Sequence, residues 1–368
     1  MKKTLIALAV LGAAAGVAHA QSNVTIYGIV DTGFIKESGS DIKMGENVNN
    51  RIGFRGVEDL GSGMKATFEL EKRFELADGT LKQSNGYKFD KKTTDWDGAA
   101  NVGLKGDAWG AVRLGRVNEL TTETIRKFDP FYQYGVGSMF LSKQRSARIS
   151  DTVRYDSPNW SGFHFGATYS LGGNTNNDSA SDQMKAVNAY GADNDGYAIS
   201  LGYDNGPLAL VGNWSRLADS NKSSVWNLGA AYKFGPAKVS LAYEQTKNKG
   251  WKLGNVNSGW VDVDDLTEAN MLESKQQNWL LGLEWTLGPG RLNASVNYNK
   301  VSDYAGFAGD DKSNMKYALG YTYNLSKRTS IYGNVAYTSY DDEAAAKYYG
   351  YDNRDSVTGV QVGITHKF

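Results

Sequence analysis

The chain has 368 residues with 40 Lys and Arg, 40 Asp and Glu and 3 His, so its formal net charge at pH 7 is zero. This balance gives no global attraction for nucleic acid or for an anionic membrane surface. The absence of cysteine excludes disulfide bridges, iron–sulfur ligation and thiol chemistry. With 43 Gly, 22 Tyr and only 5 Pro, the composition favours many strands.

Residues 1–20 have the features of a cleaved export signal. Two lysines follow Met1, residues 4–17 are an apolar run, and Ala18-His19-Ala20 fits the small-x-small cleavage pattern. The run is shorter than the roughly 20 apolar residues that span a bilayer, so a membrane anchor is the weaker interpretation. We predict a signal peptide over 1–20 and one mature domain over 21–368, in which 38 basic residues accompany 40 acidic ones.

The mature chain alternates apolar and polar residues in about sixteen short segments. In residues 163–171, 226–234 and 279–287, every second position is apolar or aromatic. This period predicts strands with one apolar face. The alternation fits a soluble sandwich, which buries that face, and equally a membrane barrel, which turns it towards lipid.

The lengths of the connections separate these two folds. Long joins at 37–48, 75–97, 119–147, 172–195, 245–276, 301–314 and 340–355 alternate with short turns at 58–63, 105–110, 157–162, 204–207, 234–236, 287–290 and 324–329, and 217–224 is intermediate. A closed barrel in an outer membrane shows this asymmetry, with short periplasmic turns and long extracellular loops. All five prolines fall in joins, where they remove no hydrogen bond from a strand. We therefore predict an all-β fold, a transmembrane antiparallel up-and-down barrel of 16 strands.

Charged residues are sorted to one face of the predicted strands. The inward positions hold Lys65, Glu69, Arg73, Lys105, Arg113, Arg154, Lys233, Glu244, Glu284, Arg291 and Lys316. A charge that faces lipid at the bilayer midplane costs roughly 2 to 4 kcal/mol, so these side chains should face a water-filled interior. Outward aromatic residues suit the two membrane interfaces, although an ordinary aromatic core is the alternative: Tyr169, Trp214, Tyr243, Trp279, Tyr298 and Tyr337.

The join 119–147 is the candidate functional segment. It is longer than ordinary loops and carries Phe128, Phe131, Tyr132, Tyr134 and Phe140, which a solvated loop would not. We expect it to fold into the barrel and narrow the interior. Its acids Glu119, Glu123 and Asp129 would then lie at the constriction. The alternative is an outside loop that contacts another subunit.

Arginines of the neighbouring strands supply the opposite charge. Six point inward by alternation: Arg51, Arg55, Arg73, Arg113, Arg148 and Arg154. Facing the acids, they would create a transverse field. Unit charges about 4 Å apart interact by roughly 1 kcal/mol in bulk water, so we expect a weak charge selectivity that falls with salt. Structural salt bridges within the wall are the alternative for Arg55 and Arg73.

Enzymatic and metal sites are poorly supported. The mature chain retains only His164 and His366, and no feature places a serine beside either one, so we predict no enzymatic activity. The acidic runs at 262–265 and 341–343 are best explained as solvated loop faces, with weak divalent-cation binding as the alternative. We predict no cofactor.

The final ten residues, GVQVGITHKF, keep the strand pattern to the end. Termini are usually frayed unless they are held. A closed barrel must pair its last strand with its first, VTIYGIVDTGF, to remove both edges. We predict that pairing.

Several motifs, in order along the chain, resemble the general diffusion porins of Gram-negative bacteria, of the beta-proteobacterial type. They are VTIYGIVDTGF at 24–34, RIGFRGVEDLGSGMKATFELE at 51–71, WGAVRLGR at 109–116, FDPF at 128–131, VRYDSPNWSGF at 153–163 and VGITHKF at 362–368. The resemblance implies an outer-membrane homotrimer among lipid and lipopolysaccharide, whose third loop forms a constriction and through which ions and small hydrophilic solutes diffuse passively. It also implies that Arg51 and Arg148 line the constriction and that the β-barrel assembly machinery reads Phe368.

The chain departs from the porin pattern at residues 97–101, DGAAN, where many relatives carry an arginine or lysine. The slight anion preference that we predict rests on the six inward arginines, which outnumber the nearby acids. A substrate-specific channel and a barrel adhesin are the alternative functions. The first lacks a run of aromatic residues on the inward face, and the second lacks large loop domains.

Overall fold

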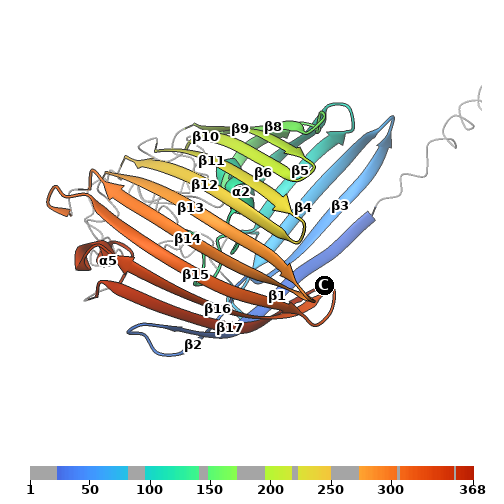
Figure 1. Cartoon of the computed structure of the whole chain (residues 1–368). Helices are drawn as coiled ribbons and strands as arrows, with labels where there is room; N and C mark the ends of the chain where they lie inside the picture. The colour runs from blue at the N-terminus through green and yellow to red at the C-terminus, as the bar shows by residue number, and fades with distance from the viewer. Residues whose placement is uncertain are drawn as a thin grey trace, which may run out of the picture.

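The computed structural model describes residues 23–81, 96–140, 148–171, 195–217, 223–249, 273–304, 307–351 and 354–368. These residues form one 17-stranded sheet that curls into a ring (Figure 1). The strands are β1 (Asn23–Glu37), β2 (Lys43–Gly45), β3 (Arg51–Gly61), β4 (Met64–Arg73), β5 (Ala99–Gly106), β6 (Gly110–Asn118), β7 (Arg148–Asp156), β8 (Phe163–Ser170), β9 (Gly196–Asn205), β10 (Leu208–Arg216), β11 (Ser224–Phe234), β12 (Ala237–Asn248), β13 (Ser274–Leu287), β14 (Gly290–Ser302), β15 (Lys312–Asn324), β16 (Thr329–Tyr340) and β17 (Ser356–Lys367). The predicted signal peptide lies outside the described residues.

The ring is closed by β1. Its first half pairs antiparallel with β3, from Asn23 opposite Val57, and its second half pairs with β17, as far as Glu37 opposite Gly359. The three-residue β2 sits in the join after β1 and pairs with it, which leaves sixteen long strands around the barrel. The predicted sixteen-stranded barrel and the predicted pairing of the first and last strands are confirmed. Because every long strand has two neighbours, none of the described long strands forms an open edge of the sheet.

The seam between β1 and β17 is held by backbone and side-chain hydrogen bonds. The backbone N–H and C=O of Gly28 exchange two hydrogen bonds of 3.1 Å with those of Phe368. On the inner face, the buried carboxylate of Asp31 accepts hydrogen bonds from the Tyr332 hydroxyl at 2.9 Å, the Asn47 N–H at 2.6 Å and the Thr365 hydroxyl. The terminal strand is therefore anchored along its length.

The outer surface is apolar in the way the alternation predicts. On β9, Ile199 and Leu201 are 59% and 62% exposed, whereas Ala198 and Ser200, which alternate with them, are buried. Similar pairs recur on the other strands and form an apolar band suited to lipid. Within the described ranges, no helix has the length and apolar character needed to cross a bilayer.

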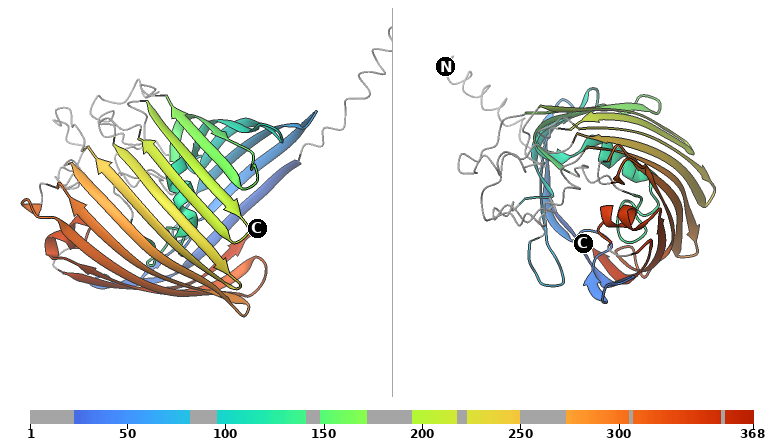
Figure 2. Two further views of the ribbon diagram at one scale, coloured as in Figure 1. Left: turned by 45° about the horizontal axis from the view of Figure 1, so that its top comes forward. Right: turned by 90° about the vertical axis from the view of Figure 1, so that its left-hand side faces the viewer.

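The joins follow the predicted order of long and short, but several of them are shorter than predicted. The join predicted at 245–276 shrinks to 249–273, because backbone pairing continues between Lys247 and Lys275 after the apolar alternation has ended. Within the described parts of the long joins there are short helices that the period-two analysis did not predict: α2 (Leu120–Ile125), followed by the 3-10 helix η1 (Arg126–Phe128), and α5 (Glu343–Tyr348). Both α2 and α5 lie within the ring when the barrel is viewed along its axis (Figure 2).

Candidate functional site

Residues 119–140 run along the inner wall of the barrel. Helix α2 begins after Glu119, whose carboxylate accepts the Thr122 N–H at 2.7 Å and the Thr121 hydroxyl at 2.6 Å. The side chains of Ile125, Phe128 and Met139 are buried in one hydrophobic cluster with wall residues of β10 to β13. The expectation that this segment folds into the barrel is therefore met for 119–140, and residues 141–147 lie outside the described ranges.

Glycines on the inner wall make room for this segment. A side-chain carbon built at Gly229 would lie 2.7 Å from the Phe128 ring, and one at Gly282 would lie 2.6 Å from Pro130. Three further glycines face the segment at 3.0 Å in the same way: Gly166 faces Leu120, Gly320 faces Phe131 and Gly359 faces Val136. The wall is therefore shaped to receive the segment along its course.

Asp129 holds the middle of the segment together. Its buried carboxylate accepts backbone N–H groups from Phe131 at 3.0 Å, Gln133 at 2.9 Å and Met139 at 3.0 Å. Burial raises the pKa of Asp129, and these three donors partly offset that rise. The carboxylates of Asp129 and Glu119 are therefore both turned into the backbone of the segment itself.

The wall beside the segment carries a cluster of arginines around Glu71. The Glu71 carboxylate lies 2.9 Å from Arg73, 3.7 Å from Arg51 and 3.9 Å from Arg148. The hydroxyl of Tyr27 also donates to it at 3.2 Å. One carboxylate thus draws together three of the six arginines predicted to point inward.

The segment adds two groups to this cluster. The hydroxyl of Tyr134 lies 3.5 Å from a guanidinium nitrogen of Arg51, and the guanidinium of Arg126 lies 5.5 Å from the centre of the Tyr134 ring. Burial alone would raise the pKa of Tyr134, but the charges of Arg126, Arg51 and Arg73 outweigh it and lower that pKa to about 8. The segment therefore presents a titratable phenol to the arginines.

A β-bulge brings a further arginine to the cluster. The register between β6 and β7 shifts between Gly115 and Val117. Arg116, at the bulge, donates from Nε to the Asp97 carbonyl at 2.8 Å, and Asp97 accepts the Arg73 N–H at 3.0 Å. Burial raises the pKa of Asp97, and the nearby arginines lower it in part. The five guanidinium groups of Arg51, Arg73, Arg116, Arg126 and Arg148 thus accompany two carboxylates, which we call the arginine cluster.

A second, balanced group lies further along the wall. Asp156 pairs with Arg113 at 2.6 Å and with Arg154 at 2.8 Å, and Arg154 also pairs with Glu123 of the segment. Burial would raise the pKa of Glu123, but the Arg154 charge overcomes this and lowers it. Here two cations meet two anions.

The structure distributes the predicted site residues unevenly. Arg51, Arg73 and Arg148 share Glu71, whereas Arg113 and Arg154 share Asp156. Arg55 shares neither carboxylate: its guanidinium lies 5.1 Å from the centre of the Tyr27 ring, whose hydroxyl donates to Glu71. Of the three loop acids, Glu123 forms an ion pair with a wall arginine, and Glu119 and Asp129 bond to their own segment.

Sequence reasoning missed four members of the arginine cluster, Glu71, Asp97, Arg116 and Arg126, and it missed Tyr134 beside them. Alternation along β4 would have found Glu71, which is two residues from Glu69. Strand alternation does not reveal Arg116, because the bulge changes the face of the sheet on which its side chain lies. It does not reveal Arg126 or Tyr134 either, because both belong to the inward segment and not to a strand. Within the described ranges, no group of three His, Cys, Asp or Glu side chains is arranged to hold a metal ion.

A second join also enters the barrel. Tyr349, which follows α5, donates to Asn299 at 2.6 Å, and its ring centre lies 5.4 Å from that of Phe140 in the inward segment. Tyr351 donates to Glu37 on β1 at 2.9 Å. Residues after α5 therefore pack between the wall and the end of the inward segment, on the side of the long loops (Figure 2).

Comparison with known proteins shows where this arrangement belongs. Residues 7–343 match the family model described as Gram-negative porin. An outer membrane porin protein of Bordetella pertussis is 33% identical, and outer membrane porin protein 32 of Delftia acidovorans is 34% identical, each over the full length of both chains.

The chain belongs to the Gram-negative porin family. It is a channel protein of the outer membrane and not an enzyme. Among solved structures, the porin is similar to an anion-selective porin from Comamonas acidovorans, with 27% identity, a TM-score of 0.69 and coverage of 95% of this chain and 100% of that one. The fold is also that of OmpF of Salmonella typhi, with 18% identity, a TM-score of 0.65 and coverage of 94% and 97%.

Proposed function

We propose that this porin is a water-filled diffusion channel for ions and small hydrophilic solutes, with a weak preference for anions set by the arginine cluster. The observation that carries this proposal is the excess, among the residues that the structure describes, of five guanidinium groups over two carboxylates in the arginine cluster. The similar porin from Comamonas acidovorans, which is described as anion-selective, is consistent with it. The long loops face the cell exterior in this proposal, and the short turns face the periplasm.

The size of the preference follows from screened electrostatics. In a water-filled interior, one unit charge about 4 Å from a passing ion contributes roughly 1 kcal/mol. Salt screens this interaction within about 10 Å at 0.1 M. The selectivity should therefore be several-fold at low salt and should decline as salt is added.

We assign different roles to the predicted site residues. Arg51 and Arg148 act on the passing anion together with Arg73, while Arg113 and Arg154 are largely compensated by Asp156 and Glu123. Arg55 contributes a further positive charge near Tyr27. Glu119 and Asp129 act indirectly, because they shape the segment that narrows the interior.

Export, assembly and oligomeric state complete the proposal. Residues 1–20 act as the signal peptide, and Phe368 with the terminal strand is the signal read by the assembly machinery. The mature porin forms a homotrimer in outer-membrane lipid, as the family resemblance implies. Chemical cross-linking of the purified porin should give a ladder that ends at three subunits, and a ladder that ends at one subunit would overturn the trimer.

Reversal potentials in planar bilayers test the selectivity. In a salt gradient, the porin should give a potential of the sign expected for anions. Replacing Arg51 and Arg148 by Ala should move that potential towards cations. The control is Arg328→Ala, which removes an exposed charge between β15 and β16 and should leave the potential unchanged. A potential near zero in the wild type, or no movement in the double variant, would refute the proposal.

A further inference from the structure

A cavity of about 220 Å³ lies on the inner side of the sheet, between the end of the inward segment and the residues that follow α5. Small residues form its floor, because Ala336 of β16 and Gly359 of β17 are directly opposite in the register. The cavity is smaller than the roughly 300 to 1,000 Å³ of sites for drug-sized molecules. It therefore suits a solute of amino-acid size.

Two opposite charges stand at the two sides of this floor. Glu37 of β1 is opposite Gly359 in the register, and Lys316 of β15 is opposite Thr338 of β16. Two strands lie between the two charged residues, which puts their backbones about 14 Å apart. Both side chains line the cavity, and no ion pair among the described residues joins one to the other. An anion and a cation thus face one small space from opposite sides.

Each charged group keeps hydrogen-bonding capacity for a ligand. The Glu37 carboxylate accepts the Tyr351 hydroxyl at 2.9 Å, and the ammonium of the exposed Lys43 approaches it only to 3.8 Å. The Lys316 ammonium donates to the Ser138 carbonyl at 3.1 Å. A carboxylate has about four lone-pair sites and an ammonium has three N–H donors, so both groups can bind a further partner.

Aromatic rings form much of the remaining wall. Neighbouring ring centres are 5.4, 5.8 and 5.9 Å apart along a row of four rings: Phe140, Tyr349, Tyr340 and Tyr351. The hydroxyl of Tyr349 donates to Asn299 at 2.6 Å, which leaves its ring as the surface offered to a ligand. Rings in such a row favour a ligand with an aromatic or apolar part, because a further ring extends the same packing.

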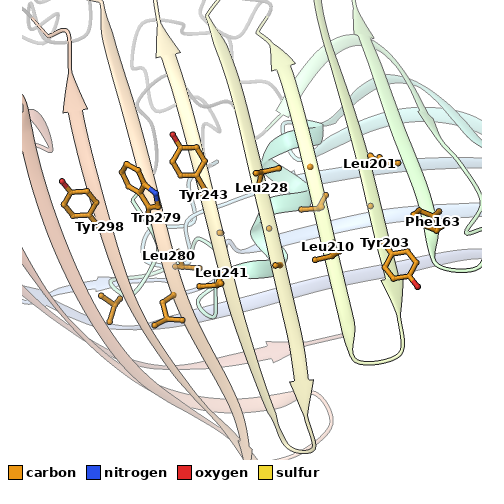
Figure 3. Close-up of a pocket in the computed structure, with 18 residues that line it drawn as sticks. Phe163, Leu201, Tyr203, Leu210, Leu228, Leu241, Tyr243, Trp279, Leu280 and Tyr298 are labelled. Atoms are coloured by element: carbon orange, nitrogen blue, oxygen red, sulfur yellow. The ribbon is translucent and has the colours of Figure 1, made fainter.

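The groove on the outward face of β8 to β14 has a different character (Figure 3). It is larger, at about 800 Å³, and no charged side chain is among the described residues that line it. A wholly apolar surface of this kind suits lipid, whereas opposite charges beside rings suit a polar solute with an apolar part. The inner cavity is therefore the candidate for a solute site.

We propose that the inner cavity binds a zwitterionic amino acid with an aromatic or apolar side chain. The ammonium of the ligand meets Glu37 and its carboxylate meets Lys316, each through a charge-assisted hydrogen bond of about 2.8 Å. The side chain of the ligand packs against the rings of Phe140 and Tyr349. The inference adds a specific site to passive diffusion, and it rests on the proposed water-filled channel for the access of the ligand.

Isothermal titration calorimetry of the purified porin with L-phenylalanine tests this site. The wild type should bind one molecule per chain. Two analogues each lack one charge, because phenylpropionate has no ammonium and phenethylamine has no carboxylate. Each analogue should bind about tenfold more weakly than phenylalanine, since a hydrogen bond between charged groups is lost.

Variants combined with these analogues separate recognition from structural damage. Glu37→Gln should weaken phenylalanine about tenfold and should not weaken phenylpropionate, which has no ammonium to lose. Lys316→Gln should weaken phenylalanine about tenfold and should not weaken phenethylamine, which has no carboxylate. The matched control is Lys327→Gln, an exposed lysine in the turn after β15, which should bind all three ligands like the wild type.

Three outcomes would overturn the proposal. They are the absence of saturable heat with phenylalanine, equal affinity for either analogue, and a loss in a variant that is equal for all three ligands, which would indicate a distorted cavity. Reversal potentials are recorded on the same wild-type preparation. A potential of the sign expected for anions, together with absent binding, would overturn the amino-acid site alone. Binding together with a potential near zero would support the site and refute the anion preference.

Discussion

The hydroxyl oxygen of Tyr134 lies 3.5 Å from a guanidinium nitrogen of Arg51, and this contact joins the inward segment to the barrel wall. Arg126, from the same segment, lies over the Tyr134 ring at 5.5 Å. The phenol of Tyr134 thus lies among the arginines to which we attribute anion preference. Its protonation state changes the net charge of the arginine cluster by one unit.

The selectivity of the porin should depend on pH through Tyr134. The nearby arginines lower the pKa of this phenol to about 8, so raising the pH from about 7 to about 9 converts it from neutral to anionic. Anion preference should fall over this interval, and reversal potentials measured at several pH values will record the change. Tyr134→Phe should lack the step. A step of equal size in that variant would assign it to another group.

Replacing Glu71 by Gln should strengthen anion preference. The substitution removes the carboxylate that lies within 3.9 Å of three arginines, and the net charge of the cluster rises by one. The arginines then repel one another, so we expect a loss of about 1 to 3 kcal/mol in stability. Reversal potentials and urea unfolding test the two effects separately. Glu69→Gln, two residues away on the same face, is the matched control, and an identical shift in both variants would count against a specific role for Glu71.

Asp129 should determine the order of the inward segment. Asp129→Ala removes three hydrogen bonds from backbone N–H groups to a buried carboxylate, each worth about 1.5 to 3 kcal/mol. The segment should loosen, with larger and noisier single-channel conductance at high salt. Asp129→Asn keeps part of the acceptor geometry and should give an intermediate conductance. Steps of wild-type size and noise in the Ala variant would refute this role.

Gly229 should be needed to seat the segment. In Gly229→Leu, the first side-chain carbon would lie 2.7 Å from the Phe128 ring, so the ring must move away from the wall. Overpacking of this kind costs about 1 to 3 kcal/mol. We expect increased conductance with the barrel intact. Gly333→Leu, where the nearest atom would be 3.8 Å away, serves as the control, and equal conductance changes in the two variants would show that the barrel itself is altered.

Strand periodicity and connection lengths were sufficient to predict the barrel. Residues 163–171, for example, alternate Phe163, Phe165 and Tyr169 with smaller or polar residues, and the structure places those three outward. Membrane strands are predictable in this way because lipid on one side and water on the other impose the period directly. Alternation did not predict the loop ends of β12 and β13. The backbone hydrogen bonds continue there, but the outward residues are no longer apolar, because these ends extend beyond the lipid.

The charge pairings were less predictable than the fold. The sequence placed six arginines inward and three acids on the segment, but it did not predict that Glu71 would serve three arginines. Glu119 and Asp129 bond to nearby backbone groups of their own segment, which are closer than any wall arginine. Whether an acid bonds to its own segment or to a wall arginine depends on the turn geometry of the segment. Residues 119–140 have no periodic pattern from which that geometry could be predicted.

The closed barrel, its strand number and the pairing of its ends follow from the amino-acid pattern alone, because each strand responds to lipid and water through its own alternation. Which charges meet depends on the folded arrangement. The bulge at Gly115 turned Arg116 towards Asp97, and the seating of Phe128 on Gly229 carried Tyr134 to Arg51. These contacts join residues far apart in the chain, and their partners are set by where the inward segment rests on the wall.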